Sequence, residues 1–163
     1  MFFHRVLVRC AALALAVAPL ACAHVPEREP ATELRFSDFY VMPIGRMGQQ
    51  PTPTLLGLAG KRVAIRGYMV AEEEPFRGQF ILAPLPVRLA DRADGPADYL
   101  PAATVFVHLP AGQRDQFVGF LPSPLEVTGT LELGAREEQG ERVSYVRLQL
   151  ADLESVQTIG RSN

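Results

Sequence analysis

The sequence predicts an all-β fold over most of its length, and three observations support that prediction. Five short runs are typical of strands, and those that begin near residues 62, 125 and 142 alternate apolar and polar residues with a period of two, which is the spacing of a half-buried strand. No long run places apolar residues at the helical spacing. Glycine and proline clusters separate the runs, as turns do. The 163 residues therefore suit a leader followed by one small β domain with a single core.

Residues 1–22 have the pattern of a secretory signal peptide. Arg5 and Arg9 give the segment a basic start, and the apolar run at residues 10–17 is too short to span a bilayer. A buried N-terminal helix is the alternative, but Pro26 and Pro30 lead into no packed element. We therefore expect an exported protein located in the periplasm.

The leader can end in two ways. Leu20-Ala21-Cys22 resembles a lipobox, in which the Cys22 sulfur is acylated and anchors the chain to a membrane. Pro19 stands where a lipobox usually has an aliphatic residue, and cleavage after Ala23 also satisfies the small-x-small rule. We favour the lipoprotein, so the sequence predicts lipidation at Cys22.

Residues 23–54 are expected to form a proline-punctuated tether and then a segment packed across the domain. Packing is favoured because the stretch from Leu34 to Ile44 is too apolar to face solvent. A partner-binding peptide is the alternative for this stretch.

Residues 55–156 are expected to form the β domain, and residues 157–163 a frayed tail. The five predicted strands are a run from about residue 62 that ends before the acidic turn at residues 72–75, then residues 79–83, 104–109, 125–133 and 142–150. Gly134 is predicted to open a turn. Residues 111–123 are predicted to plug one end of the sheet with a short helix or turn, since each buried phenylalanine stabilises by about 1.5–3 kcal/mol.

Gly67 and Gly129 each lie inside a predicted strand. Glycine at such a position indicates a hard bend or a close approach of two backbones. Five strands with such bends predict a small five-stranded, OB-like antiparallel barrel. A β-sandwich is the alternative.

Four sequence blocks strengthen this prediction through a resemblance. The blocks are Gly60 to Val70, Phe80-Ile81-Leu82-Ala83-Pro84, Tyr99-Leu100-Pro101 with the strand after it, and Leu125 to Glu132. They resemble an uncharacterised family of exported bacterial proteins, the domain-of-unknown-function family numbered three-two-nine-nine. The resemblance covers about residues 55–152 and implies an OB-like fold, an envelope location and a link to transport systems. Many members of that family carry cysteines before the third strand, where this chain has none.

Charge and cysteine content exclude several classes of function. Once the leader and its two arginines are removed, the 18 acidic residues of the chain outnumber the basic ones and the net charge is about −4. This balance gives no electrostatic footprint for nucleic acid. Cys10 and Cys22 are the two cysteines of the chain, so the domain is expected to hold no disulfide and no thiol nucleophile.

Catalytic signatures are missing as well. A nucleophilic triad needs a histidine base, and beyond the leader the sequence has His24 in the tether and His108 on a predicted strand. A lone histidine at such a position is typical of a surface or a satisfied residue. No nucleophile elbow and no phosphate-cradling glycine loop is present. The sequence therefore predicts a non-enzymatic protein with no cofactor.

Two weaker groups of residues are candidate sites. Asp91, Asp94 and Asp98 share one loop and have the oxygen ligands that calcium prefers, although their spacing is not that of an EF-hand and a solvated polar loop is the alternative. Arg62, Arg66 and Tyr68 share one face of the first strand and could contact an anionic partner there, unless they are ordinary solvated side chains.

The expected role is that of a binding or accessory module for another envelope component, with an envelope protein as partner. A periplasmic protein that binds a small ligand or a divalent cation, with a link to transport, is the alternative.

Overall fold

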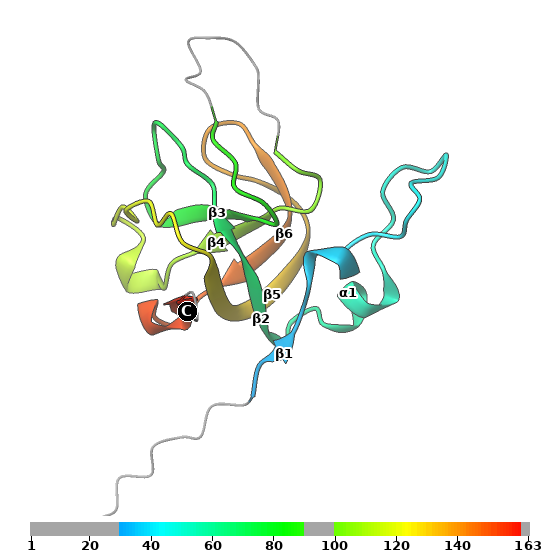
Figure 1. The fold of residues 1–163 in the computed structure, drawn as a ribbon, viewed down its shortest axis with the longest axis horizontal. Coiled ribbons are helices and arrows are strands. Elements are labelled where there is room, and N and C mark those ends of the chain that lie inside the picture. Colours follow the sequence, from blue (N-terminus) through cyan, green and yellow to red (C-terminus); the bar gives the residue numbers. More distant parts are fainter. Residues whose placement is uncertain (1–29, 90–99, 161–163) are drawn as a thin grey trace, which may run out of the picture.

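The computed structural model describes residues 30–89 and 100–160. The expected signal peptide, Cys22 and the Asp91, Asp94 and Asp98 loop lie outside these described residues. The described chain is all-β, with seven strands in one mixed sheet (Figure 1). Its strands are β1 Thr32–Glu33, β2 Arg62–Met69, β3 Gln79–Ala83, β4 Val105–His108, β5 Leu125–Glu137, β6 Val143–Gln149 and β7 Val156–Thr158. Short helical turns are η1 Phe36–Asp38, α1 Pro53–Gly57, η3 Ala111–Gln113 and η4 Leu153–Ser155.

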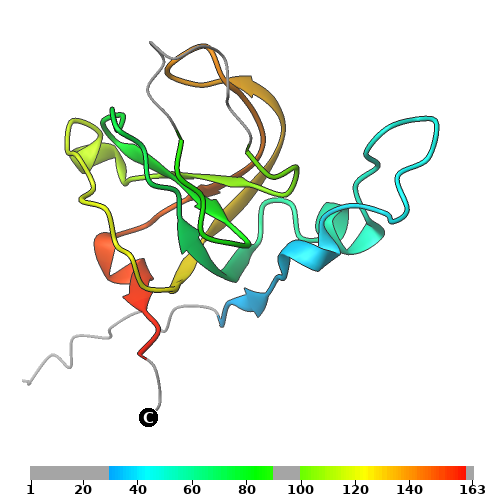
Figure 2. The ribbon, with the colours of Figure 1, turned by 45° about the horizontal axis from the view of Figure 1, so that its top comes forward.

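Five of the strands pair in a ring. β2 pairs with β3, β3 with β4, β4 with β6, β6 with β5, and β5 returns to β2. The curled ring is visible in Figure 2. Its seam is the β2–β3 contact, where the register joins Tyr68 to Ala83 and Met69 to Leu82. This connectivity is the five-stranded, partly open Greek-key barrel of the OB type, so the predicted barrel is confirmed.

The ring is mixed, not antiparallel as expected. β4 and β6 run parallel. They are not consecutive in the chain, because β5 lies between them and runs in the opposite direction, so that β6 enters the sheet in the same direction as β4. β1 adds to β2 in parallel, and β7 adds to β5 in antiparallel register. The pairing of Gln157 and Thr158 in β7 places these two residues in the sheet, where a frayed tail was expected.

Two interior glycines let strands approach closely, as predicted. A Cβ atom on Gly67 would lie 2.6 Å from the carbonyl oxygen of Ala83, across the β2–β3 seam. A Cβ atom on Gly129 would lie 2.9 Å from the carbonyl oxygen of Gln149. Both glycines are therefore needed for space inside the ring.

The main core fills the ring with the inward side chains of its strands. It includes Val63 and Ile65 of β2, Leu131 of β5 and Leu148 of β6, all buried. A smaller cluster covers the outer face of β3 and β4, where Ile81 and Phe106 pack with Leu89.

The segment before α1 divides into a packed part and an exposed part. Leu34 and Phe39 are buried in the main core, as the packing prediction required. Residues 41–50 are all exposed and project from the barrel as a loop (Figure 2, cyan). Met42 is 71% exposed and Met47 84% exposed, so this half of the segment does not pack.

Residues 111–123 contain the short helical turn that was expected, η3, and Val118 packs against the main core. The expected burial of the phenylalanines is wrong, because Phe117 and Phe120 are exposed. The guanidinium of Arg77 lies 4.3 Å from the centre of the Phe117 ring, which is a cation–π contact. The segment therefore contacts both the main core and the loop between β2 and β3.

Candidate functional site

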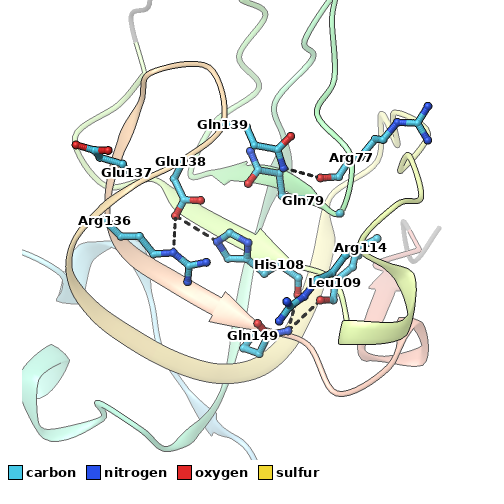
Figure 3. Close-up of a pocket in the computed structure, with 11 residues that line it drawn as sticks. Arg77, Gln79, His108, Leu109, Arg114, Arg136, Glu137, Glu138, Gln139 and Gln149 are labelled. Carbon is cyan, nitrogen blue, oxygen red and sulfur yellow. Dashed lines mark hydrogen bonds and ion pairs between the residues drawn. The ribbon is translucent and has the colours of Figure 1, made fainter.

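A polar pocket of about 230 Å³ opens between the β2–β3 loop and the β5–β6 hairpin (Figure 3). In OB-type barrels the second and third strands, together with the loops 1–2 and 4–5, form the usual ligand face. Here those strands are β3 and β4, and those loops are the ones that flank the pocket. The pocket therefore lies where the fold class places its ligands.

A row of three polar residues crosses the floor of this pocket. The strand register pairs Gln79 of β3 with His108 of β4, and His108 with Gln149 of β6. The Gln149 amide is satisfied, because its Nε2 donates to the carbonyl oxygen of Leu109 at 3.0 Å. The Gln79 side chain is 5% exposed, and within the described residues it makes no hydrogen bond.

A β-bulge directs the hairpin toward this row. β5 continues through Gly134, where the register shifts and Arg136 comes to pair with Ser144. Gly134 has φ 111°, a conformation that favours glycine. The predicted turn at Gly134 is therefore wrong: the residue is part of a bulge, and the strand extends to Glu137.

Arg147 secures the bulge from the outer face of β6. Its side chain is 7% exposed. Nη1 donates to the carbonyl oxygen of Gly134 at 2.6 Å and to Ser144 Oγ at 3.0 Å. A buried guanidinium thus satisfies a carbonyl group that the register shift removes from the regular ladder.

Glu138 is the buried charge of the pocket, with a side chain that is 3% exposed. Its Oε1 accepts a hydrogen bond of 2.6 Å from Ser144 Oγ and lies 3.3 Å from Nε2 of His108. Arg136 Nε lies 4.0 Å from the same oxygen. Three groups therefore compensate this carboxylate inside the protein.

Burial lowers the pKa of His108, and the neighbouring Glu138 carboxylate offsets this only in part. The imidazole is therefore neutral at pH 7. A neutral ring that faces a carboxylate through Nε2 carries its proton there, which assigns the Nε2–H tautomer and leaves Nδ1 as an acceptor.

This pKa shift predicts a pH-dependent stability. The usual histidine pKa is about 6.5, and below this pH the unfolded chain takes up a proton at His108 that the folded chain takes up less readily. The free energy of unfolding therefore falls as the pH falls below about 6.5, and His108 has no effect on it above that pH. Urea unfolding between about pH 7.5 and pH 5.5 should show a smaller loss of stability for His108→Gln than for the wild type. Equal losses in the two proteins would contradict the assignment.

Ser144, Glu138 and His108 have the residue types of a hydrolytic triad but not its order. In a triad the histidine lies between the hydroxyl and the carboxylate, whereas here Glu138 lies between Ser144 and His108. Ser144 is also 1% exposed. The cluster therefore has no histidine in contact with the hydroxyl, as a triad requires.

The residues predicted for a ligand face lie elsewhere. Arg62, Arg66 and Tyr68 share β2, and the six residue steps from Arg62 to Tyr68 span about 20 Å of strand. Arg66 pairs with Glu126 of β5 at 2.7 Å, and Tyr68 lines a different hollow beside Val87 and Phe120. The three residues do not converge on one small ligand.

A metal-ligating cluster and a membrane-spanning helix are both absent from the described part of the chain. Residues 30–89 and 100–160 contain no group of three metal-ligating side chains. No helix in these ranges is both long enough and apolar enough to cross a membrane. The calcium candidates Asp91, Asp94 and Asp98 lie outside these ranges.

Fold and site together define a class, a small OB-type barrel with a polar pocket at its usual ligand face. Comparisons of this chain with protein-family profiles, curated proteins and solved structures find no match. The resemblance to the family numbered three-two-nine-nine stays a prediction.

Proposed function

We propose that this chain is a non-enzymatic binding module of the cell envelope whose barrel holds a small polar solute in the pocket between the β2–β3 loop and the β5–β6 hairpin. The sequence predicts two roles, a module for a protein partner and, as the alternative, a protein that binds a small ligand. We propose the second. Export and anchoring at Cys22 belong to the proposal and rest on the residues of the leader.

The observation that carries the proposal is the Gln79 side chain. Gln79 is 95% buried and its side chain has no hydrogen-bond partner among the described residues. Its amide atoms are nevertheless open to the pocket, because among the described residues the fully buried side-chain polar atom without a partner is Gln113 Oε1. The Gln79 amide is therefore accessible to a solute and not already engaged by the protein. It lines the pocket. A solute with complementary polar atoms would satisfy this amide, which gives a polar residue at this position a function.

Substitution of Gln79 should separate stability from binding. Gln79→Met is expected to raise the free energy of unfolding by about 1 kcal/mol, because it replaces an amide that has no protein partner among the described residues with an apolar side chain at a largely buried position. Gln139→Met is the matched control, since Gln139 is exposed and its Nε2 donates to the carbonyl oxygen of Arg77 at 2.9 Å; it should give no such increase. Urea unfolding of the three proteins measures the difference.

The same variant identifies the Gln79 amide resonances for a binding test. The side-chain amide signals of Gln79 are the ones that disappear from the nuclear magnetic resonance spectrum of the Gln79→Met variant. These signals are followed while nitrogen-labelled wild-type protein is titrated with succinate, inorganic phosphate, succinamide or 1,4-diaminobutane. Movement of these signals with at least one solute supports the proposal. Signals that stay fixed with all four, or a Gln79→Met protein that is less stable than wild type, contradict it.

The prediction of an envelope-protein partner has a separate surface available. The exposed loop at residues 41–50 adjoins an apolar pocket of about 610 Å³ lined by Tyr40, Leu56 and Tyr145, among others. No unpartnered buried polar group lies there among the described residues, so the polar pocket is the stronger candidate for the function.

A further inference from the structure

We infer that the solute is a small oxyanion, a carboxylate or a phosphate, held between the Arg114 guanidinium and the Gln79 amide. This inference rests on the proposed function and adds the chemical class of the ligand.

Arg114 is placed beside Gln79 by a close backbone contact. A Cβ atom on Gly78 would lie 2.4 Å from the carbonyl oxygen of Arg114. The Gly78 amide donates to the carbonyl oxygen of Gln116 at 2.7 Å, and its own carbonyl accepts from the amide of Leu109 at 2.8 Å. The segment after β4 is thus tied to the residue that precedes Gln79, which brings a cation to the edge of the pocket.

The Arg114 side chain has no partner among the residues that the structure describes. Among the described residues it makes no hydrogen bond and no ion pair, and it is exposed at the pocket edge. Figure 3 shows Arg114 and Arg136 extending toward the His108 side of the pocket from opposite directions. Arg77, by contrast, points away and stacks on Phe117.

The acidic residues of the pocket do not cancel this charge. Glu138 is already engaged by Ser144, His108 and Arg136. Glu137 points away from the pocket (Figure 3). Among the described residues that line the pocket, the guanidinium of Arg114 and the amide nitrogen of Gln79 make neither a hydrogen bond nor an ion pair, and both favour an anion.

Volume limits the size of the ligand. The pocket of about 230 Å³ has the volume of about eight water molecules and is smaller than typical pockets for drug-sized ligands, which begin at about 300 Å³. A four-carbon dicarboxylate or inorganic phosphate fits inside this volume.

Calorimetric titration of the full chain with four probes tests the class of ligand. Succinate and inorganic phosphate supply the two oxyanions, succinamide is the neutral isostere of succinate, and 1,4-diaminobutane is the cation. One-to-one binding of succinate or phosphate is expected, and the stronger of the two identifies the source of the oxyanion. Arg114→Gln should weaken that binding about ten- to a hundredfold, the effect of one charge-assisted hydrogen bond.

Arg46→Gln is the matched control, because Arg46 is exposed on the loop at residues 41–50 and the substitution removes the same charge outside the pocket. It should leave affinity unchanged. Equal weakening by the two substitutions would show a net-charge effect and overturn the inference. If succinamide or 1,4-diaminobutane binds and neither oxyanion does, the oxyanion class is wrong and the proposed function stands. If none of the four probes binds, the inference and the proposed function are both wrong.

Discussion

Gly78→Ala should lower the free energy of unfolding by about 3 kcal/mol. Gly78 has φ 71°, and a side chain in this region costs about 1–2 kcal/mol. The added methyl group would also lie 2.4 Å from the carbonyl oxygen of Arg114, a backbone atom that cannot rotate away. Forcing such a shift costs about 1–3 kcal/mol more.

Gly60→Ala separates these two causes. Gly60 has φ 74°, but a Cβ atom there would meet nothing within 4 Å, so only the backbone strain applies and a loss of about 1 kcal/mol is expected. Urea unfolding of both variants measures the difference. Equal losses would show that the segment at residues 114–116 does not lie against Gly78, and the pocket edge would then be wrongly placed.

Arg147→Ala should cost about 3 kcal/mol, the usual cost of removing one member of a buried charged network. The substitution leaves the bulge carbonyl of Gly134 without its 2.6 Å donor and removes the 3.0 Å bond to Ser144 Oγ. Because this bulge directs Glu138 toward His108, the variant should also disturb the pocket. Urea unfolding and the amide signals of the β5–β6 hairpin report the two effects.

Arg66→Ala is the control for Arg147→Ala. The Arg66–Glu126 ion pair has a shorter distance, 2.7 Å against 3.4 Å for Arg147–Glu132, but the Arg66 side chain is 64% exposed. Exposed ion pairs contribute little to stability, so this variant should unfold almost like the wild type. A larger loss for Arg66→Ala than for Arg147→Ala would contradict the view that burial decides which arginine matters.

The sequence contained enough local information for most strands. Strand β3 was predicted at its observed bounds because Gly78 and Pro84 bracket an apolar run. Strand β5 extended beyond its predicted end because a glycine that interrupts the period-two pattern marks a turn and a bulge equally well. The expectation that Phe117 and Phe120 are buried is wrong. Apolar content alone does not distinguish a core phenylalanine from one that stacks on a surface arginine, as Phe117 does on Arg77.

The site was missed because its parts come from separate elements. Gln79 begins β3, Arg114 follows η3, and Glu138 follows β5. Only the ring register brings them together, and a single sequence does not show that register. The predicted ligand face, Arg62, Arg66 and Tyr68, lies on β2, the first strand of the ring. The second and third strands of the ring, β3 and β4, line the pocket.

A crystal structure of the full chain grown with succinate would show what the Gln79 amide contacts. We expect a carboxylate between the Gln79 amide nitrogen and the Arg114 guanidinium, with Glu138 still bound to Ser144. A Gln79 amide satisfied by another protein group, in a pocket that contains water alone, would contradict this expectation.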